Sequence, residues 1–307
     1  MPHNPWPSIE NFHNFAKDNP ALVTYGPWAA KVKLHGTNAA VRIEPDGTVV
    51  AQSRNRDLTT TDDNCGFAAF VERTADLWRE AVDTWGGTRT YFGEWIGPGI
   101  QKGVAASSIP RRTFCIFAER IDGVNRGIWY IEPRFIHVDL PEIPDVHVIP
   151  YYAGGTTGVT AEAINDAVAT VEAEDPYIKD VFGVSGVGEG LVYYCTDRNA
   201  WGDAPVMFKA KGAEHRVVAA RTPTAPPENA SDVQAFVATY VTEARLEQIA
   251  FEVNQTPAPY DIRRTGDFLK SFNADVLKEA DLGTLTWKDV GGAVNREAAR
   301  WYKARAL

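Results

Sequence analysis

The organisation of the chain follows from the stretch Lys31-Val32-Lys33-Leu34-His35-Gly36-Thr37-Asn38. Lys33 stands three residues before Gly36, and the apolar run at 39–43 that follows predicts a β-strand. A lysine in this position presents a primary amine beside a turn, and an amine becomes a nucleophile once it loses its proton. Because Lys-x-x-Gly also arises by chance, the meaning of this stretch depends on the segments that follow it.

Length and composition restrict the class of protein. With 307 residues, 44% hydrophobic and 23% charged, the chain is long enough for two globular domains, one of them large. It has no uninterrupted apolar run of about 20 residues and no basic, apolar leader, so we expect a cytoplasmic protein without a membrane span. The formal net charge of −9 argues against binding nucleic acid by bulk charge alone, but it allows local basic sites.

The cysteines give no sign of a metal or disulfide framework. There are three, Cys65, Cys115 and Cys195, and they are widely separated. We expect reduced thiols, two of them packed in the core because they lie in strand-like runs.

Strands and turns dominate the first two thirds of the chain. A leading segment at 8–30 carries aromatic anchors, and Pro45-Asp46-Gly47 predicts a hairpin turn whose returning strand, 48–54, brings Arg54 back near the start of the Lys33 stretch. A glycine-rich loop at 97–103 fits no standard phosphate-binding fingerprint. The other expected elements are helices at 67–82 and 161–173, strands at 90–95, 113–120, 190–195 and 206–211, and a loop-rich stretch from 141 to 155.

The strand at 206–211 carries two lysines on one face. Side chains alternate along a strand, so Met207, Lys209 and Lys211 point one way and the residues between them the other. An edge strand facing solvent would show the same alternation.

A composition change divides the chain. Residues 221–230 contain three prolines and read as a linker, and beyond them apolar residues recur at helical spacing. Ser231 with Gln234, and Thr286 with Asp289, are candidate helix starts. We therefore expect an α+β catalytic domain at 1–221, a linker at 222–230 and a small all-α domain at 231–307, whose last helix carries Arg296, Arg300, Lys303 and Arg305.

Attack by Lys33 on a nucleotide α-phosphate would need its amine neutral, although a free lysine has a pKa of about 10.4. Positive charge from Arg54, Lys209, Lys211 and a divalent metal would depress that pKa and stabilise the transition state. Carboxylates are needed for the metal or the nucleoside. Glu94 and Glu189 lie at strand positions that can line a cleft, and Phe117 offers an aromatic face for a purine.

Taken in order, these segments resemble the motifs of ATP-dependent RNA ligases of the phage T4 RNA ligase 2 family, in the covalent nucleotidyltransferase superfamily. The resemblance covers 33–211. It rests on Lys33-Leu34-His35-Gly36-Thr37-Asn38, Ser53-Arg54-Asn55-Arg56, Phe92-Gly93-Glu94-Trp95, Gly97-Pro98-Gly99-Ile100-Gln101, Phe114-Cys115-Ile116-Phe117, Glu189-Gly190-Leu191-Val192-Tyr193 and Phe208-Lys209-Ala210-Lys211.

This resemblance implies an ATP-grasp-like domain of antiparallel sheets flanked by helices, and a role for each motif. Lys33 is the residue that becomes adenylated. Arg54 holds the phosphate or ribose, with Arg56 as the alternative arginine, and Lys209 and Lys211 contact phosphate.

The remaining motif residues are expected around the nucleoside and the RNA. Glu94 is expected on the ribose, Phe117 on the adenine and Glu189 on the metal. His35 helps to pass the nucleotide to the RNA 5′-phosphate, or else only packs in its turn, and Asn38 is expected on the RNA with Arg54. DNA ligases and capping enzymes usually carry aspartate at the position of His35 and add an OB barrel, whereas this chain ends in a helical region.

The implied activity is RNA ligation in three steps, through a lysyl-AMP and an RNA-adenylate, with ATP and Mg²⁺, or Mn²⁺ in its place. We expect a monomer that repairs nicked duplex RNA and makes contact with it partly through residues 231–307, in the host cytoplasm if the protein is viral. Rival interpretations are a ligase for DNA or mixed-strand ends, a guanylyl-transferring capping enzyme and a non-catalytic nucleic-acid-binding relative.

Overall fold

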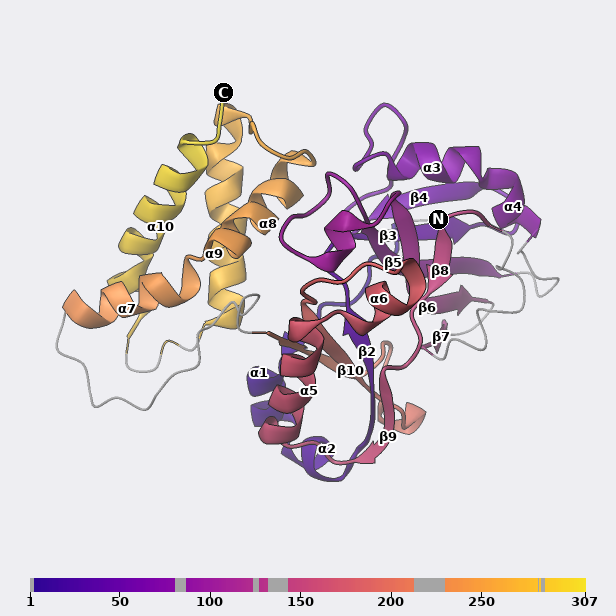
Figure 1. Cartoon of the computed structure of the whole chain (residues 1–307), viewed down its shortest axis with the longest axis horizontal. Coiled ribbons are helices and arrows are strands. Elements are labelled where there is room, and N and C mark those ends of the chain that lie inside the picture. Colours follow the sequence, from indigo (N-terminus) through magenta and orange to yellow (C-terminus); the bar gives the residue numbers. More distant parts are fainter. Residues whose placement is uncertain are drawn as a thin grey trace. The chain divides into compact units, whose positions relative to one another are not determined.

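Figure 1 shows the computed structural model, which describes residues 3–80, 87–123, 127–131, 143–212, 230–280, 282 and 285–307. The chain divides into two compact units, Met1–Gly212 and Ala213–Leu307. The first unit has two sheets, largely antiparallel and flanked by helices, and the second is helical, which confirms the predicted fold class. The expected linker, except Ala230, lies outside the described residues.

The first sheet contains the strand that ends at Lys33. Its order is β1 (Glu10–Asn11), β11 (Met207–Lys211), β10 (Gly190–Cys195), β2 (Pro27–Lys33) and β9 (Ala153–Thr157). Every neighbouring pair is antiparallel except β1 with β11.

The second sheet follows directly in sequence. Its order is β4 (Val49–Ser53), β3 (Thr37–Ile43), β5 (Thr88–Ile96), β6 (Thr113–Asp122) and β7 (Ile128–Tyr130), and β8 (Val146–Val148) pairs with β6 in parallel.

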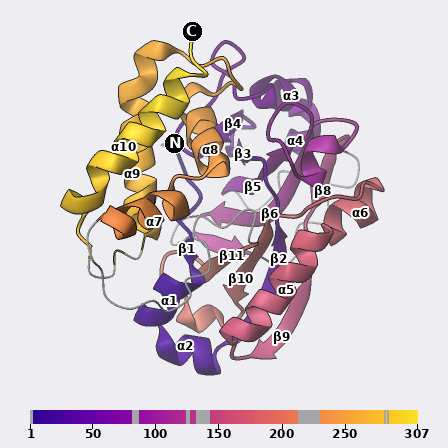
Figure 2. The ribbon, with the colours of Figure 1, turned by 60° about the vertical axis from the view of Figure 1, so that its left-hand side comes forward.

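Alternation along the first sheet separates a core face from a polar face. Trp28, Val32 and Phe208 point into a core formed with α1 (Phe12–Asp18), α5 (Ala161–Ala173) and α6 (Pro176–Phe182). Figure 2 shows α5 lying along this sheet, with α2 (Pro20–Tyr25) near it. The opposite face carries Lys31 and Lys33, and it is turned toward the second sheet.

Apolar side chains of both sheets meet on that inner side. Ala40, Phe92 and Ala118 of the second sheet form one buried cluster with Val192, Tyr194 and Met207 of the first. Trp6 and Trp129 complete it, with ring centroids 5.4 Å apart. Burying each large side chain stabilises the fold by about 2 kcal/mol, so this cluster holds the two sheets together.

The outer face of the second sheet is covered by two short helices. Phe67 in α3 (Phe67–Arg73) lies 5.1 Å from the Phe114 ring, and Trp78 in α4 (Ala75–Glu80) lies 5.7 Å from Tyr91. The prediction of a single helix at 67–82 is therefore wrong in one respect, because the helix breaks at Thr74. The Thr74 hydroxyl donates to the Phe70 carbonyl and accepts from the Trp78 indole N–H. Residues 81 and 82 lie outside the described chain.

Several other elements differ from the sequence prediction. The leading segment contains β1, α1, α2 and most of β2, and the stretch read as loop contains β8 and the start of β9. These strands are short and owe their conformation to the neighbours they pair with. Helix α6 is not among the predicted elements, although its sequence contains a recognisable start signal. Asp175 caps the helix by accepting from the Ile178 N–H, and Pro176 occupies its first turn.

The second unit contains four α-helices in its described part: α7 (Ala230–Tyr240), α8 (Glu243–Asn254), α9 (Thr265–Glu279) and α10 (Trp287–Lys303). Phe268, Phe272, Val290, Val294 and Tyr302 are fully buried between them. Thr286 and Asp289 form the capping box that the sequence predicted.

Two further predictions concern the cysteines and membrane-spanning helices. All three cysteines are free, with Cys115 and Cys195 buried as predicted and Cys65 partly buried. None of the helices in the described ranges combines the length and apolar character that a bilayer crossing requires.

Candidate active site

Three strands of the first sheet bring Lys33 and Lys211 together. Gly190 in β10 lies opposite Lys33 of β2 on one side and opposite Lys211 of β11 on the other. Glu189 comes directly before Gly190, so it stands between the two lysines. Gly190 has a φ of +146°, and a Cβ there would lie 2.2 Å from the Ala210 carbonyl oxygen, so only glycine fits this close strand contact.

Glu189 is the centre of the charged cluster. Its side chain is only 1% exposed, and its carboxylate lies 2.6 Å from Nζ of Lys33, 3.2 Å from Nζ of Lys211 and 3.5 Å from Nδ1 of His35. Burial opposes ionisation, but Lys33, Lys211 and His35 outweigh it and hold the pKa of Glu189 well below its usual range. Glu189 is therefore a carboxylate at neutral pH.

The turn between β2 and β3 depends on the glycine of the Lys-x-x-Gly stretch. A Cβ on Gly36 would lie 2.4 Å from the Trp95 carbonyl oxygen, so this backbone approach excludes any other residue. The Gly36 N–H donates to Oε1 of Glu94 at 3.0 Å, and the Gln101 side chain donates to the Gly36 carbonyl at 3.0 Å. The turn is thus held from β5 and from the glycine-rich loop.

Glu94 is a second carboxyl of the site, half-buried and opposite Asn38 in the β3–β5 ladder. Burial raises the pKa of Glu94 to about 7, and the charge of Glu189 adds to the rise. This rise in pKa is partly offset by Lys33, by the Gly36 N–H and by Arg54. Glu94 therefore changes its protonation state near neutral pH.

The two arginines after β4 have different environments. Arg54 is exposed, its charge acts on Glu94, and its carbonyl accepts a hydrogen bond from Nε2 of His3 at 3.1 Å. Arg56 is ion-paired with Asp62 at 2.6 Å. Of the two, Arg54 is the one whose charge acts on a carboxyl of the site.

Phe117 and Lys209 complete the predicted set. The β5–β6 register passes from Phe92–Ala118 to Gly93–Ile116, so Phe117 is the extra residue of a β-bulge. Its side chain is half-buried and packs against both the core cluster of the first sheet and the cluster between the sheets. Lys209 lies two residues before Lys211, opposite Val192.

Within the described ranges, no group of three His, Cys, Asp or Glu side chains is arranged to hold a metal ion by itself. A cation at Glu189 would have to take its other ligands from phosphate oxygens and water, which is the usual coordination of Mg²⁺. The lysines around Glu189 would then be free to pair with those phosphates. The donor set of this site fits a metal that arrives with a nucleotide.

Two contacts escaped the sequence reasoning. The sequence places Gln101 in the glycine-rich loop without predicting its contact, and Lys31 shares a face with Lys33 without a predicted role. The signal for Lys31 was the two-residue period of the strand. Nothing in the sequence pointed to the Gln101 contact, because the loop and the turn meet only in three dimensions.

A profile of the RNA ligase family matches residues 26–211, which is more than half of the chain and contains all the residues of the charged cluster. The chain therefore belongs to the RNA ligase family.

Solved structures agree on the fold. An apo mutant of Naegleria gruberi RNA ligase superposes with a TM-score of 0.52 at 20% sequence identity, and a mutant of the same enzyme with ATP and Mn superposes with a TM-score of 0.51 at 20% identity. Each alignment covers 69% of this chain and 57% of the Naegleria chain. The chain thus spans less than two thirds of the length of these relatives.

Proposed function

We propose that this protein is an ATP-dependent RNA ligase of the phage T4 RNA ligase 2 type, which seals nicks in duplex RNA as a cytoplasmic monomer. The observation that carries the proposal is the convergence of Lys33, His35 and Lys211 on one buried carboxylate, within the segment that matches the RNA ligase family. The Naegleria relative, a mutant of which is solved with ATP and Mn, supports ATP as the nucleotide.

In the first step, Nζ of Lys33 attacks the α-phosphorus of ATP. A phosphorus–nitrogen bond forms, the bond to the β-phosphate oxygen breaks, and pyrophosphate and the amine proton leave. Lys209, Lys211 and Arg54 neutralise the phosphate charge that builds up, since positioning and charge stabilisation account for most of the catalysis in such transfers.

In the second step, a 5′-phosphate oxygen of the RNA attacks the phosphorus of the lysyl-AMP. The phosphorus–nitrogen bond breaks and Lys33 recovers its proton. The 3′-hydroxyl of the neighbouring strand then attacks the 5′-phosphate and expels AMP, which closes the phosphodiester bond. His35, Asn38 and Arg54 are assigned to the RNA side of these two steps.

Glu94 and Phe117 are assigned to the nucleoside, with Glu94 on the ribose and Phe117 on the adenine. Glu189 is assigned to Mg²⁺, with Mn²⁺ as a substitute. When bound, the metal neutralises phosphate charge. Glu189 would then pair less tightly with Lys33, which would favour release of the nucleophile.

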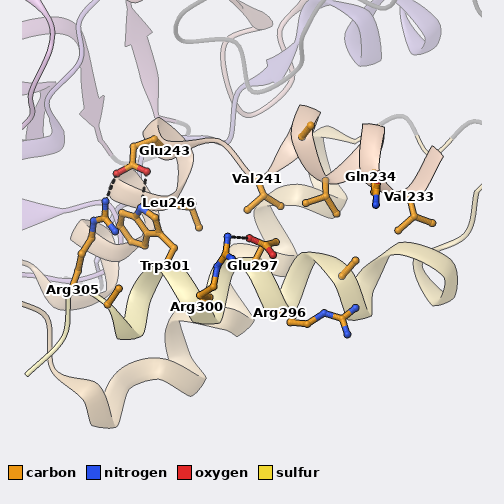
Figure 3. Close-up of a pocket in the computed structure, with 14 residues that line it drawn as sticks. Val233, Gln234, Val241, Glu243, Leu246, Arg296, Glu297, Arg300, Trp301 and Arg305 are labelled. Carbon is orange, nitrogen blue, oxygen red and sulfur yellow. Dashed lines mark hydrogen bonds and ion pairs between the residues drawn. The ribbon is translucent and has the colours of Figure 1, made fainter. Parts of the chain in front are cut away.

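The second unit is proposed to contact the RNA through a groove of about 700 Å³ between α7, α8 and α10 (Figure 3). Arg305 and Trp301 bind Glu243 there, and Arg300 pairs with Glu297. Arg296 makes no ion pair with any other residue of the described chain. An exposed arginine face suits phosphate oxygens.

The proposal is tested with freshly purified, de-adenylated protein, Mg²⁺ and α-labelled ATP or GTP, followed by denaturing electrophoresis. A chase with nicked duplexes carrying RNA or DNA ends follows. We expect the protein to take up label from ATP and to release that label as an RNA nick closes. Labelling from GTP indicates a capping-type enzyme, discharge only on DNA ends indicates a DNA ligase, and absence of any adduct refutes the ligase proposal.

A further inference from the structure

Lys31 is a buried amine that the ligation steps do not use. Its side chain is 1% exposed, its Nζ donates to the carbonyl oxygen of Phe117 at 2.8 Å, and it lies 5.3 Å from the centre of the Tyr151 ring. No carboxylate of the described chain pairs with it. Burial lowers the pKa of Lys31 to about 7. Since lysines are seldom buried without an acidic partner, the position needs a reason beyond packing.

The reason lies in the acceptor. Phe117 is the extra residue of the β5–β6 bulge, so it has no opposite residue in β5. Lys31 lies in β2, which belongs to the other sheet, and donates to the carbonyl of Phe117. The hydrogen bond therefore ties the two sheets together at the point where the ladder is interrupted.

The bulge also sets the direction of the Phe117 ring. A bulge leaves its extra residue unpaired and re-aims its side chain, so contacts from outside the ladder can fix that residue's orientation. The Phe117 ring packs edge-on against Trp6, with centroids 4.8 Å apart, on the inner side of the sheets. The Lys31 hydrogen bond fixes the backbone at Phe117, and the contact with Trp6 limits rotation of the Phe117 ring.

We propose that Lys31 is a positioning residue for the nucleotide base: by holding the carbonyl of Phe117, it keeps the Phe117 ring in the orientation that receives the adenine. This inference rests on the proposed function, in which Phe117 stacks on the base. Lys31 then acts on nucleotide affinity and not on the transfer of AMP. Its removal should appear in KM for ATP, with kcat almost unchanged.

A double-mutant cycle on the full chain tests this, with KM for ATP and kcat measured for formation of the lysyl-AMP. Lys31→Met should raise KM about tenfold, which corresponds to about 1.4 kcal/mol, a typical value for one buried hydrogen bond. Phe117→Ala should raise KM by at least as much. The double variant should equal Phe117→Ala alone, because Lys31 acts through Phe117.

Two further variants make the outcome decisive. Lys31→Arg keeps a donor and should bring KM back toward that of the unmodified protein. Arg245→Met, which removes a buried cation from the second unit, should lower the unfolding temperature and leave KM unchanged. The proposal is overturned if Lys31→Met leaves KM unchanged, or if its effect multiplies that of Phe117→Ala. An unchanged KM in Phe117→Ala refutes the stacking role itself, which is a separate failure.

Discussion

Lys33 and Glu189 form the tightest contact of the charged cluster, at 2.6 Å, and the whole proposed chemistry begins with their separation. Lys33→Ala removes the only amine assigned to attack. We expect it to abolish labelling by α-labelled ATP and to lower the unfolding temperature, because the buried Glu189 carboxylate loses its closest partner. A Lys33→Ala protein that still takes up label would show that the nucleophile lies elsewhere.

Lys211 contacts the same carboxylate from the opposite strand, at 3.2 Å. Lys211→Ala should lower the rate of lysyl-AMP formation by about 100-fold, the usual loss when one charge-stabilising group is removed from an active site. The measurement is single-turnover labelling at saturating ATP. Lys179→Ala, at an exposed helix position, is the matched control. Equal rates for both variants would remove Lys211 from the phosphate site.

The raised pKa of Glu94 predicts that the free energy of unfolding depends on pH. Its pKa is about 4.5 when unfolded and about 7 when folded, so the protonated form stabilises the fold at low pH, and this contribution is lost as the pH rises through 7. Above pH 7 the ionised carboxyl costs about 3 kcal/mol.

Glu94→Gln keeps an acceptor for the Gly36 N–H and cannot ionise. We therefore expect it to raise the unfolding temperature at pH 8 and to change it little at pH 5, as measured by calorimetry. An equal change at both pH values would mean that Glu94 does not titrate between them.

The β2–β3 turn shows how one residue can determine an element. Gly36→Ala would push a methyl group against the Trp95 carbonyl, so the turn and with it Lys33 must move. We expect a loss of about 3 kcal/mol in the free energy of unfolding, together with slower adenylation. Denaturant unfolding and labelling measure the two effects.

Gly292→Ala in α10 is the control for this substitution. Nothing lies within 4 Å of an added Cβ there, and alanine favours a helix, so stability should rise by about 0.5–1 kcal/mol. If Gly36→Ala behaved like Gly292→Ala, the turn would be more adaptable than the contact distances indicate.

The elements that the sequence predicted well have a strong local signal. Helix α5 agrees with its prediction at both ends, since its Thr160 cap and apolar spacing are written within the segment. Strands β8 and β9 do not. The two glycines of β9, Gly154 and Gly155, have little strand preference, and this strand is ordered by pairing with β2. Sequence reasoning is weakest where a strand depends on its partner.

The site shows the same division. The residue types and their order along the chain pointed to Lys33, Glu189 and Lys211, but not to their mutual contacts, which come from the pairing of β2, β10 and β11. The sequence also left Arg54 and Arg56 as alternatives. The Arg56–Asp62 pair favours Arg54, and that pair could not be foreseen from spacing alone.

Neither part of the chain carries a net positive charge, and this bears on RNA binding. Residues 222–307 contain ten Lys and Arg against twelve Asp and Glu, so attraction to RNA must come from local clusters such as Arg296 and Arg300. A double change, Arg296→Glu with Arg300→Glu, should weaken nick sealing about tenfold or more and leave lysyl-AMP formation unchanged.

Salt provides the complementary measurement. RNA binding by the unmodified chain should fall steeply between 50 and 200 mM salt, and the double variant should show a shallower slope because fewer phosphate contacts are lost. Identical slopes would place the RNA contacts outside this groove.

The strand order of the first sheet has a consequence for synthesis of the protein. β2 lies between β9 and β10, which are made more than a hundred residues later, so the strand that ends at Lys33 waits with both edges unpaired while the ribosome completes most of the unit. Such distant pairings form slowly and leave strand edges open to wrong partners. The charged cluster is therefore completed only once β11 has emerged, and a chain cut before residue 207 would lack one of its three strands.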